Sequence, residues 1–136
     1  MNALAVVAVS LVLGGMAFFS FVMAPLVFRV LERETAAVFM RAAFPLYYAV
    51  MAVAAALGAL FAAFGNMFDA ILLAAVAAIF VALRQILAPA IERARNGRSA
   101  GDETARENFR RLHGLSVAVN LAQLVAVTAA LLRLIR

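Results

Sequence analysis

The stretch that decides the fold is Asn2–Phe28, which reads NALAVVAVSLVLGGMAFFSFVMAPLVF and contains no ionisable side chain. About 20 apolar residues in a helix cross the roughly 30 Å hydrocarbon core of a bilayer, so this run is long enough to span a membrane. A signal peptide has a positively charged start and an apolar stretch of only about 7–15 residues. We therefore interpret Asn2–Phe28 as a transmembrane helix and not as a cleaved leader.

The whole chain shares this apolar character. Hydrophobic residues make up 68% of the 136 positions and charged residues 14%, whereas soluble proteins have roughly 45–50% and about 25%. Further apolar runs follow the first one, and they predict four spans at about residues 2–28, 42–64, 69–91 and 106–132. The sequence thus predicts an all-α integral membrane four-helix bundle, with residues 1–136 forming a single transmembrane domain in contact with the lipid bilayer.

The segments between the runs carry the charge and the turn residues. We expect Arg29–Arg41 to form an interfacial helical turn or a short amphipathic helix, and Pro45 to lie in the first turn of the second span, where proline is tolerated. Gly65-Asn66 predicts a short turn before the third span. The charged stretch Glu92–Arg111 contains Asn96-Gly97, which predicts a solvated loop that becomes helical again near Thr104.

The arginines predict the orientation in the membrane. The chain has a net charge of +5, with twelve arginines and no lysine. Nine of them lie in the first and third connections: Arg29, Arg33, Arg41, Arg93, Arg95, Arg98, Arg106, Arg110 and Arg111. Positive residues are retained on the cytoplasmic side, so we expect these connections in the cytoplasm and both termini outside, in a bacterial inner membrane. The arginines bracket apolar runs and do not alternate with aromatic residues, so no nucleic-acid partner is expected.

The fourth span carries the most informative polar pattern. His113, Ser116, Asn120 and Gln123 follow one another at spacings of three, four and three, which places them on one helix face. Polar groups facing lipid are costly, so this seam is expected to face the bundle interior, a second protomer or a water-filled cavity. It either joins helices by hydrogen bonds worth about 0.6 kcal/mol each or lines a site for a small solute, proton or metal ion.

Three other polar residues of the spans stand out. Tyr48 lies near the entrance of the second span and joins the candidate binding residues. Arg84 either extends to the interface or contacts an anion or Glu92, and it is also a candidate. Asp69 is expected to cap the start of the third span.

The sequence argues against common catalytic and metal sites. There is no cysteine, and zinc needs three or four protein ligands, so an intramolecular zinc site is not expected. His113, the one histidine, remains a weak candidate ligand for a metal or for a haem shared by two protomers. No cofactor is identified. Nothing in the sequence indicates a hydrolytic triad or a phosphate-binding loop, so we do not expect an enzyme.

Three motifs resemble the transmembrane protein 205-like family of small four-helix membrane proteins: FFSFVMAPLVF at 18–28, FPLYY at 44–48 and NFRRLHGLSVAVNL at 108–121. The resemblance implies a four-span bundle. The human member of that family is associated with resistance to platinum drugs, so the resemblance also implies export or vesicular handling of soft metals or drugs. The positions that match the family's motifs are Pro25, Phe44, Pro45, Tyr48, Phe109, His113, Ser116 and Asn120.

Three functions follow as hypotheses. The first is transport, permeation or handling of a small solute or metal ion along the polar seam, with homo-oligomers providing space that one small protomer lacks. The second is a membrane redox protein that binds haem or a metal through His113. The third is a scaffold or assembly protein that binds other helices through its seam and through Gly14-Gly15, where small side chains allow close approach.

Overall fold

The computed structural model describes residues 2–136, and this part of the chain forms four helical spans and no strand. Each span is long and apolar enough to cross a membrane. The elements are α1 (Ala3–Phe18), the π-helix η1 (Phe19–Met23), α2 (Ala24–Val30), α3 (Arg33–Ala62), α4 (Met67–Ala82), the π-helix η2 (Leu83–Leu87), α5 (Ala88–Ser99) and α6 (Glu103–Leu134). The predicted all-α four-helix bundle is confirmed, and the protein is a multi-pass membrane protein.

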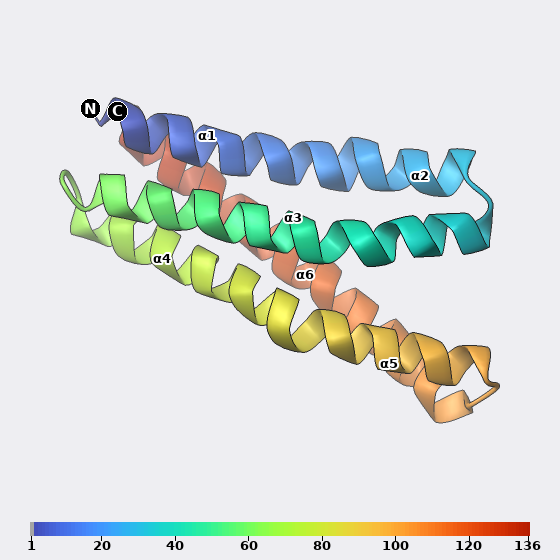
Figure 1. Cartoon of the computed structure of the whole chain (residues 1–136). Coiled ribbons are helices and arrows are strands. Elements are labelled where there is room, and N and C mark those ends of the chain that lie inside the picture. The colour runs from blue at the N-terminus through green and yellow to red at the C-terminus, as the bar shows by residue number, and fades with distance from the viewer. Residues whose placement is uncertain (1) are drawn as a thin grey trace.

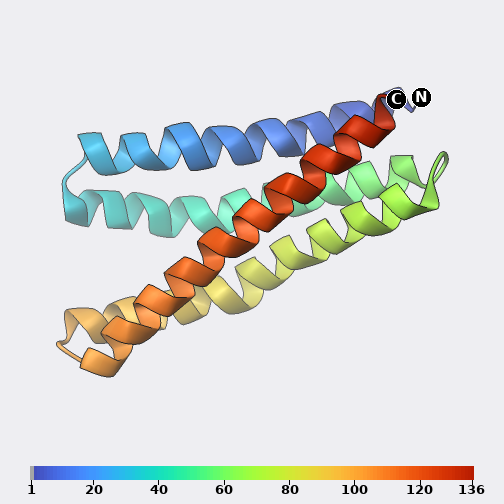
Figure 2. The ribbon, with the colours of Figure 1, turned by 180° about the vertical axis from the view of Figure 1, so that it is seen from behind.

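The spans are packed at one end of the bundle and diverge at the other (Figure 1). The α3 helix packs most extensively against α4 and α1, while α6 crosses the bundle diagonally and contacts α1, α4 and α5 (Figure 2). Both termini and the α3–α4 connection lie at what we call the closed end. The α2–α3 and α5–α6 connections lie far apart at the opposite, arginine-rich end.

The helices at the arginine-rich end extend beyond the apolar runs. The α3 helix has 30 residues, about 45 Å at 1.5 Å per residue, compared with a hydrocarbon core of about 30 Å. The expectation of a separate interfacial element at Arg29–Arg41 is therefore wrong, because α2 continues to Val30 and α3 begins at Arg33. Backbone hydrogen bonding does not stop where the lipid ends, so the charged residues continue the transmembrane helices.

The predicted loop in the third connection is also wrong, because a helix again continues through the charged residues. Asn96-Gly97 lies inside α5 and not in a loop, and the chain turns only at residues 100–102. Gly101 has a φ of 88°, a left-handed conformation that glycine adopts without strain. Asp102 then caps α6, since its Oδ1 accepts hydrogen bonds from the amides of Thr104 at 2.9 Å and Ala105 at 3.3 Å.

Prolines shape two of the spans in the same way. Each π-helix directly precedes an Ala-Pro pair, Ala24-Pro25 in the first span and Ala88-Pro89 in the third. Proline has no amide donor and its ring collides with the carbonyl four residues earlier, and the wider π turn relieves that collision. Pro45, expected in the first turn of its span, lies instead inside the long helix α3.

The hydrophobic core lies in the closed half of the bundle. Its fully buried side chains come from all four spans and include Val9, Val12, Met16, Leu73, Phe80 and Val127. A second, smaller cluster of Val27, Ala36 and Met40 joins α2 to α3 at the arginine-rich end. The core thus holds all four spans together at one end, whereas at the other end α2 packs on α3 and α5 packs on α6 as separate pairs.

Polar contacts secure the closed end. Asn66 caps α4 by accepting a hydrogen bond from the Phe68 amide at 2.9 Å. Asp69, expected to be the cap, instead accepts a hydrogen bond from Arg133 Nε of α6 at 2.7 Å and is only 2% exposed. The Arg133 guanidinium also lies 4.8 Å from the centroid of the Phe68 ring. These contacts hold α4 and α6 together.

Glycine allows the closest helix approach between α5 and α6. A Cβ atom at Gly97 would lie 2.5 Å from Ala105 Cβ, which cannot move aside without shifting the helix. Of the pair Gly14-Gly15, expected to meet another helix, only Gly15 is so placed that an added Cβ atom would lie within 4 Å of another span among residues 2–136, where it meets the flexible Met51 side chain.

Gly97→Ala is therefore expected to lower the free energy of unfolding by about 1–2 kcal/mol, because the added methyl forces α5 away from α6. Gly114→Ala is the matched control, since no other helix among residues 2–136 lies within 4 Å of a Cβ atom placed there. That change should be neutral or stabilise the helix by up to about 1 kcal/mol. Unfolding in mixed micelles followed by circular dichroism measures both. Equal behaviour of the two variants would refute the close packing at Gly97.

Candidate functional site

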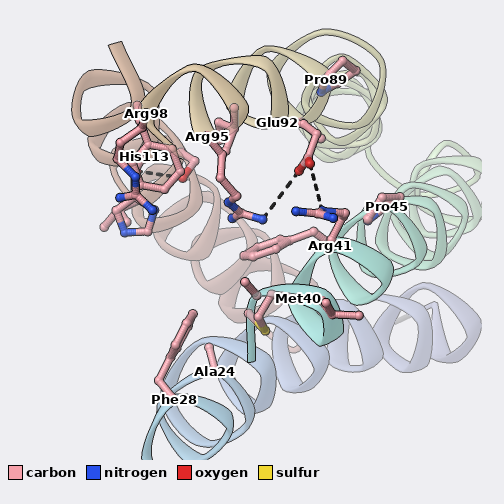
Figure 3. A pocket seen from close by; sticks show the side chains of 18 of the residues that line it. Ala24, Phe28, Met40, Arg41, Pro45, Pro89, Glu92, Arg95, Arg98 and His113 are labelled. Atoms are coloured by element: carbon pink, nitrogen blue, oxygen red, sulfur yellow. Dashed lines mark hydrogen bonds and ion pairs between the residues drawn. The ribbon is translucent and has the colours of Figure 1, made fainter. Parts of the chain in front are cut away.

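The divergence of the spans leaves a crevice of about 1380 Å³ at the arginine-rich end. One wall is formed by η1, α2 and α3, and the other by η2, α5 and α6. Figure 3 shows side chains of both walls pointing toward the space between them. The crevice ends against the core, so it opens at the arginine-rich end and is closed toward the termini.

Aromatic rings form the floor of the crevice. Phe19 and Tyr47 stack with ring centroids 4.2 Å apart, and Phe44 meets Phe19 edge-on at 5.3 Å. Tyr48 lies beside Phe44 and Tyr47 and packs on Phe80 of the core. Both tyrosines line the crevice although they are less than a tenth exposed. The floor is closely packed and mainly apolar, as in binding sites for small molecules.

A short chain of hydrogen bonds crosses this floor. The Tyr47 hydroxyl donates to Asn120 Oδ1 at 3.3 Å, and Asn120 Nδ2 donates to Ser20 Oγ at 2.9 Å. Asn120 therefore links α6 to both α3 and η1. At this position the polar seam faces the bundle interior.

An ion-pair network joins the two walls closer to the mouth. Glu92 of α5 accepts from Arg41 Nε of α3 at 2.8 Å and lies 3.5 Å from Arg95 Nη1 (Figure 3). Arg84 Nε donates to the Pro45 carbonyl at 3.2 Å, a second contact between the walls. The considered pair of Arg84 with Glu92 is not formed, because Arg41 and Arg95 occupy that carboxylate. Arg84 remains an exposed cation lining the crevice.

His113 lies on the α6 wall in an aromatic and cationic setting. Its exposed ring is parallel to that of Phe109, with centroids 6.2 Å apart, and the Arg98 guanidinium lies 4.2 Å from the Phe109 centroid. The neighbouring Ser116 hydroxyl donates to the His113 backbone carbonyl at 2.7 Å. Residues 2–136 contain no group of three or more histidine and carboxylate side chains that could hold a metal ion. The metal role of His113 stays a prediction.

The fourth seam residue lies apart from the other three. Gln123 is 2% exposed, does not line the crevice, and donates from Nε2 to the Val76 carbonyl of α4 at 3.1 Å. Within residues 2–136 its Oε1 meets no donor. The structure therefore brings five of the six predicted binding residues to one cavity: Tyr48, Arg84, His113, Ser116 and Asn120.

Sequence reasoning missed several residues that shape the crevice. Ser20 and Tyr47 complete the hydrogen bonds of Asn120, while Arg41 and Glu92 form the bridge between the walls. Charged residues at helix ends look like solvated surface in a sequence. Ser20 offers one signal, since it is the only polar residue between Ser10 and Arg29.

The chain was compared with known protein families, and one family matches it. The family described as "Domain of unknown function (DUF4149)" matches residues 7–100. The chain belongs to the DUF4149 family. The matched range covers most of α1 and everything from there to the end of α5, so the DUF4149 match includes one wall of the crevice and the η2 and α5 parts of the other. It ends before α6, which carries the polar seam.

Searches of curated proteins and of solved structures found no match to the chain. Membership of the DUF4149 family is thus the one relationship that the comparisons establish. The resemblance to the transmembrane protein 205-like family stays a prediction.

Proposed function

We propose that this DUF4149 protein transports or handles a small solute through the crevice, working as a single transmembrane domain. The observation that carries the proposal is the asymmetry of the bundle. The crevice opens at the arginine-rich end and stops at a packed core, beyond which the Asp69–Arg133 pair secures the closed end. A carrier that exposes its site to one side at a time needs a cavity of this kind.

The walls are joined by contacts that can be exchanged. The Glu92 carboxylate is about one-third exposed and Arg41 about half exposed, so their pair contributes no more than about 1 kcal/mol. Contacts this weak can break and re-form while the two walls move against each other, with the solute taking over some of them. This supports movement of the two walls against each other as the transport step.

We place the arginine-rich end in the cytoplasm of a bacterial inner membrane, with both termini outside. Nine of the twelve arginines lie toward that end on α2, α3, α5 and α6, which supports this orientation. The resemblance to the transmembrane protein 205-like family supports a handling role. A small solute is favoured over a metal ion because residues 2–136 offer no ligand cluster. The homo-oligomer, the haem site and the scaffold role stay predictions.

Cysteine accessibility tests the transport step directly, because the chain has no cysteine of its own. Ser20→Cys places a single thiol on the crevice floor. In native membrane vesicles, where the solute is present, a membrane-impermeant maleimide is expected to label this thiol from the arginine-rich side and, more slowly, from the other side. Thr35→Cys and Phe64→Cys, exposed at opposite ends, define the two sides and should each react from one side only. Labelling of Ser20→Cys from one side alone would contradict transport.

A further inference from the structure

We propose that the crevice binds an anionic lipid, with its headgroup among the arginines at the mouth and an acyl chain between α2 and α6. This inference rests on the proposed function and names the substrate class of that site. Three observations carry it: unpaired positive charge at the mouth, an apolar side opening, and the depth of the crevice.

The lining carries more positive than negative charge. Six arginines line it, namely Arg33, Arg41, Arg84, Arg95, Arg98 and Arg106. Four carboxylates oppose them, namely Glu34, Glu92, Asp102 and Glu103. Within residues 2–136, Glu92 pairs with Arg41 and Arg95, and no carboxylate lies within ion-pair distance of the other four arginines. Arginine binds phosphate through several parallel hydrogen bonds, so the mouth complements an anionic headgroup.

The crevice also continues into the lipid-facing surface. Phe21 of η1 and Phe28 of α2 line it and are 61% and 60% exposed, and on the facing helix α6 Val117 and Leu121 are 46% and 49% exposed. Figure 3 shows Phe28 on the wall opposite His113 and Arg98. A water-soluble anion would gain nothing from these side chains, whereas an acyl chain would pack against them. The ligand therefore has an apolar part that enters from the bilayer.

The depth of the crevice fits one leaflet. Arg106 at the mouth and Asn120 on the floor both belong to α6 and are separated by about 21 Å at about 1.5 Å per residue. The acyl chains of one leaflet occupy about half of the roughly 30 Å core. A lipid with its headgroup at the arginines would thus place its chain end near the aromatic floor.

The two tyrosines provide a specific reporter. The chain has no tryptophan, and Tyr47 and Tyr48 are its only tyrosines. Both line the crevice, so bromine atoms on an acyl chain bound there should quench the tyrosine emission. We would titrate the full chain in micelles with phosphatidylglycerol or phosphatidylcholine, each brominated on its acyl chains. Engaging one arginine is worth about 1 kcal/mol, so half-quenching is expected at an approximately fivefold lower fraction of phosphatidylglycerol.

Matched variants locate the binding site. Arg33→Gln and Arg98→Gln are each expected to reduce the preference, and together to abolish it, whereas Arg136→Gln at the closed end removes the same charge and should leave it unchanged. Unaltered circular dichroism shows that each variant is folded. Equal quenching by both lipids, an unchanged preference in the double variant, or relief of quenching by water-soluble glycerol phosphate would overturn the proposal. None of these outcomes affects two-sided labelling of Ser20→Cys, so failure of lipid binding is distinguishable from failure of transport.

Discussion

Arg133→Gln is expected to lower the free energy of unfolding by about 3 kcal/mol, one of the two largest effects foreseen for this protein. Asp69 is 2% exposed and its Oδ1 lies 2.7 Å from Arg133 Nε. Without the guanidinium a buried carboxylate loses its partner, and breaking a buried pair from one side costs about 3–5 kcal/mol. Because the Arg133 side chain is about half exposed, we expect a loss at the lower end of this range. Unfolding in mixed micelles, followed by circular dichroism, measures it.

Two further variants separate this pair from a general charge effect. Arg136→Gln removes a nearby positive charge that forms no ion pair within residues 2–136, and it should change stability by less than about 0.5 kcal/mol. Asp69→Asn combined with Arg133→Gln removes both charges and should recover much of the loss. If the loss of stability in the double variant equalled the sum of the losses in Asp69→Asn and Arg133→Gln, the two residues would be acting independently and the proposed coupling would be wrong.

Phe80→Ala is expected to have an effect of similar size, again about 3 kcal/mol. Phe80 is among the largest fully buried side chains and packs against Tyr47 and Tyr48 beneath the crevice floor. Lipid is as apolar as phenylalanine, so burial from water explains little of its contribution. The loss comes from the cavity and from the dispersion contacts that disappear with the ring.

Ile79→Ala is the control for Phe80→Ala. Ile79 is the preceding residue of α4 and is 40% exposed on the outer surface, where lipid replaces the removed atoms without leaving a cavity. Its replacement should cost less than about 1 kcal/mol. Comparable losses for the two variants would show that packing beneath the floor is not what stabilises the bundle. Tyrosine emission offers a second readout, because only Phe80→Ala should alter the surroundings of the two rings.

The sequence predicted the helices better than their ends. Apolar runs identify where lipid must surround the chain, and each span contains one. They do not identify where a helix stops, since α3 and α5 continue through charged residues that water solvates as readily in a helix as in a loop. Pro45 and Asn96-Gly97 were misread for this reason. The turn between α5 and α6 is instead made by Gly101, with its positive φ, and by Asp102, which caps α6.

The sequence predicted which candidate residues lie together only along one helix, although it also named Tyr48 and Arg84 on other spans. Spacing on α6 placed His113, Ser116 and Asn120 on one face, and the structure brings them to the crevice. Their partners come from other spans, as with Ser20, which lies 100 positions away from Asn120 in the chain. Helical periodicity carries no information about such distant contacts. The same limit explains why Glu92 was not assigned to Arg41.

By itself, the sequence determined the fold class and the approximate number and location of the spans. The physical reason is that uncharged runs of this length are stable only in lipid, and there only as helices that satisfy their own backbone hydrogen bonds. The tertiary structure alone decided that the spans close at one end and diverge at the other. That outcome depends on how α6 crosses its neighbours, and α6 is held there by the Gln123–Val76 hydrogen bond, the Asp69–Arg133 pair and the contact of Gly97 with Ala105. The crevice exists because those contacts leave two walls apart.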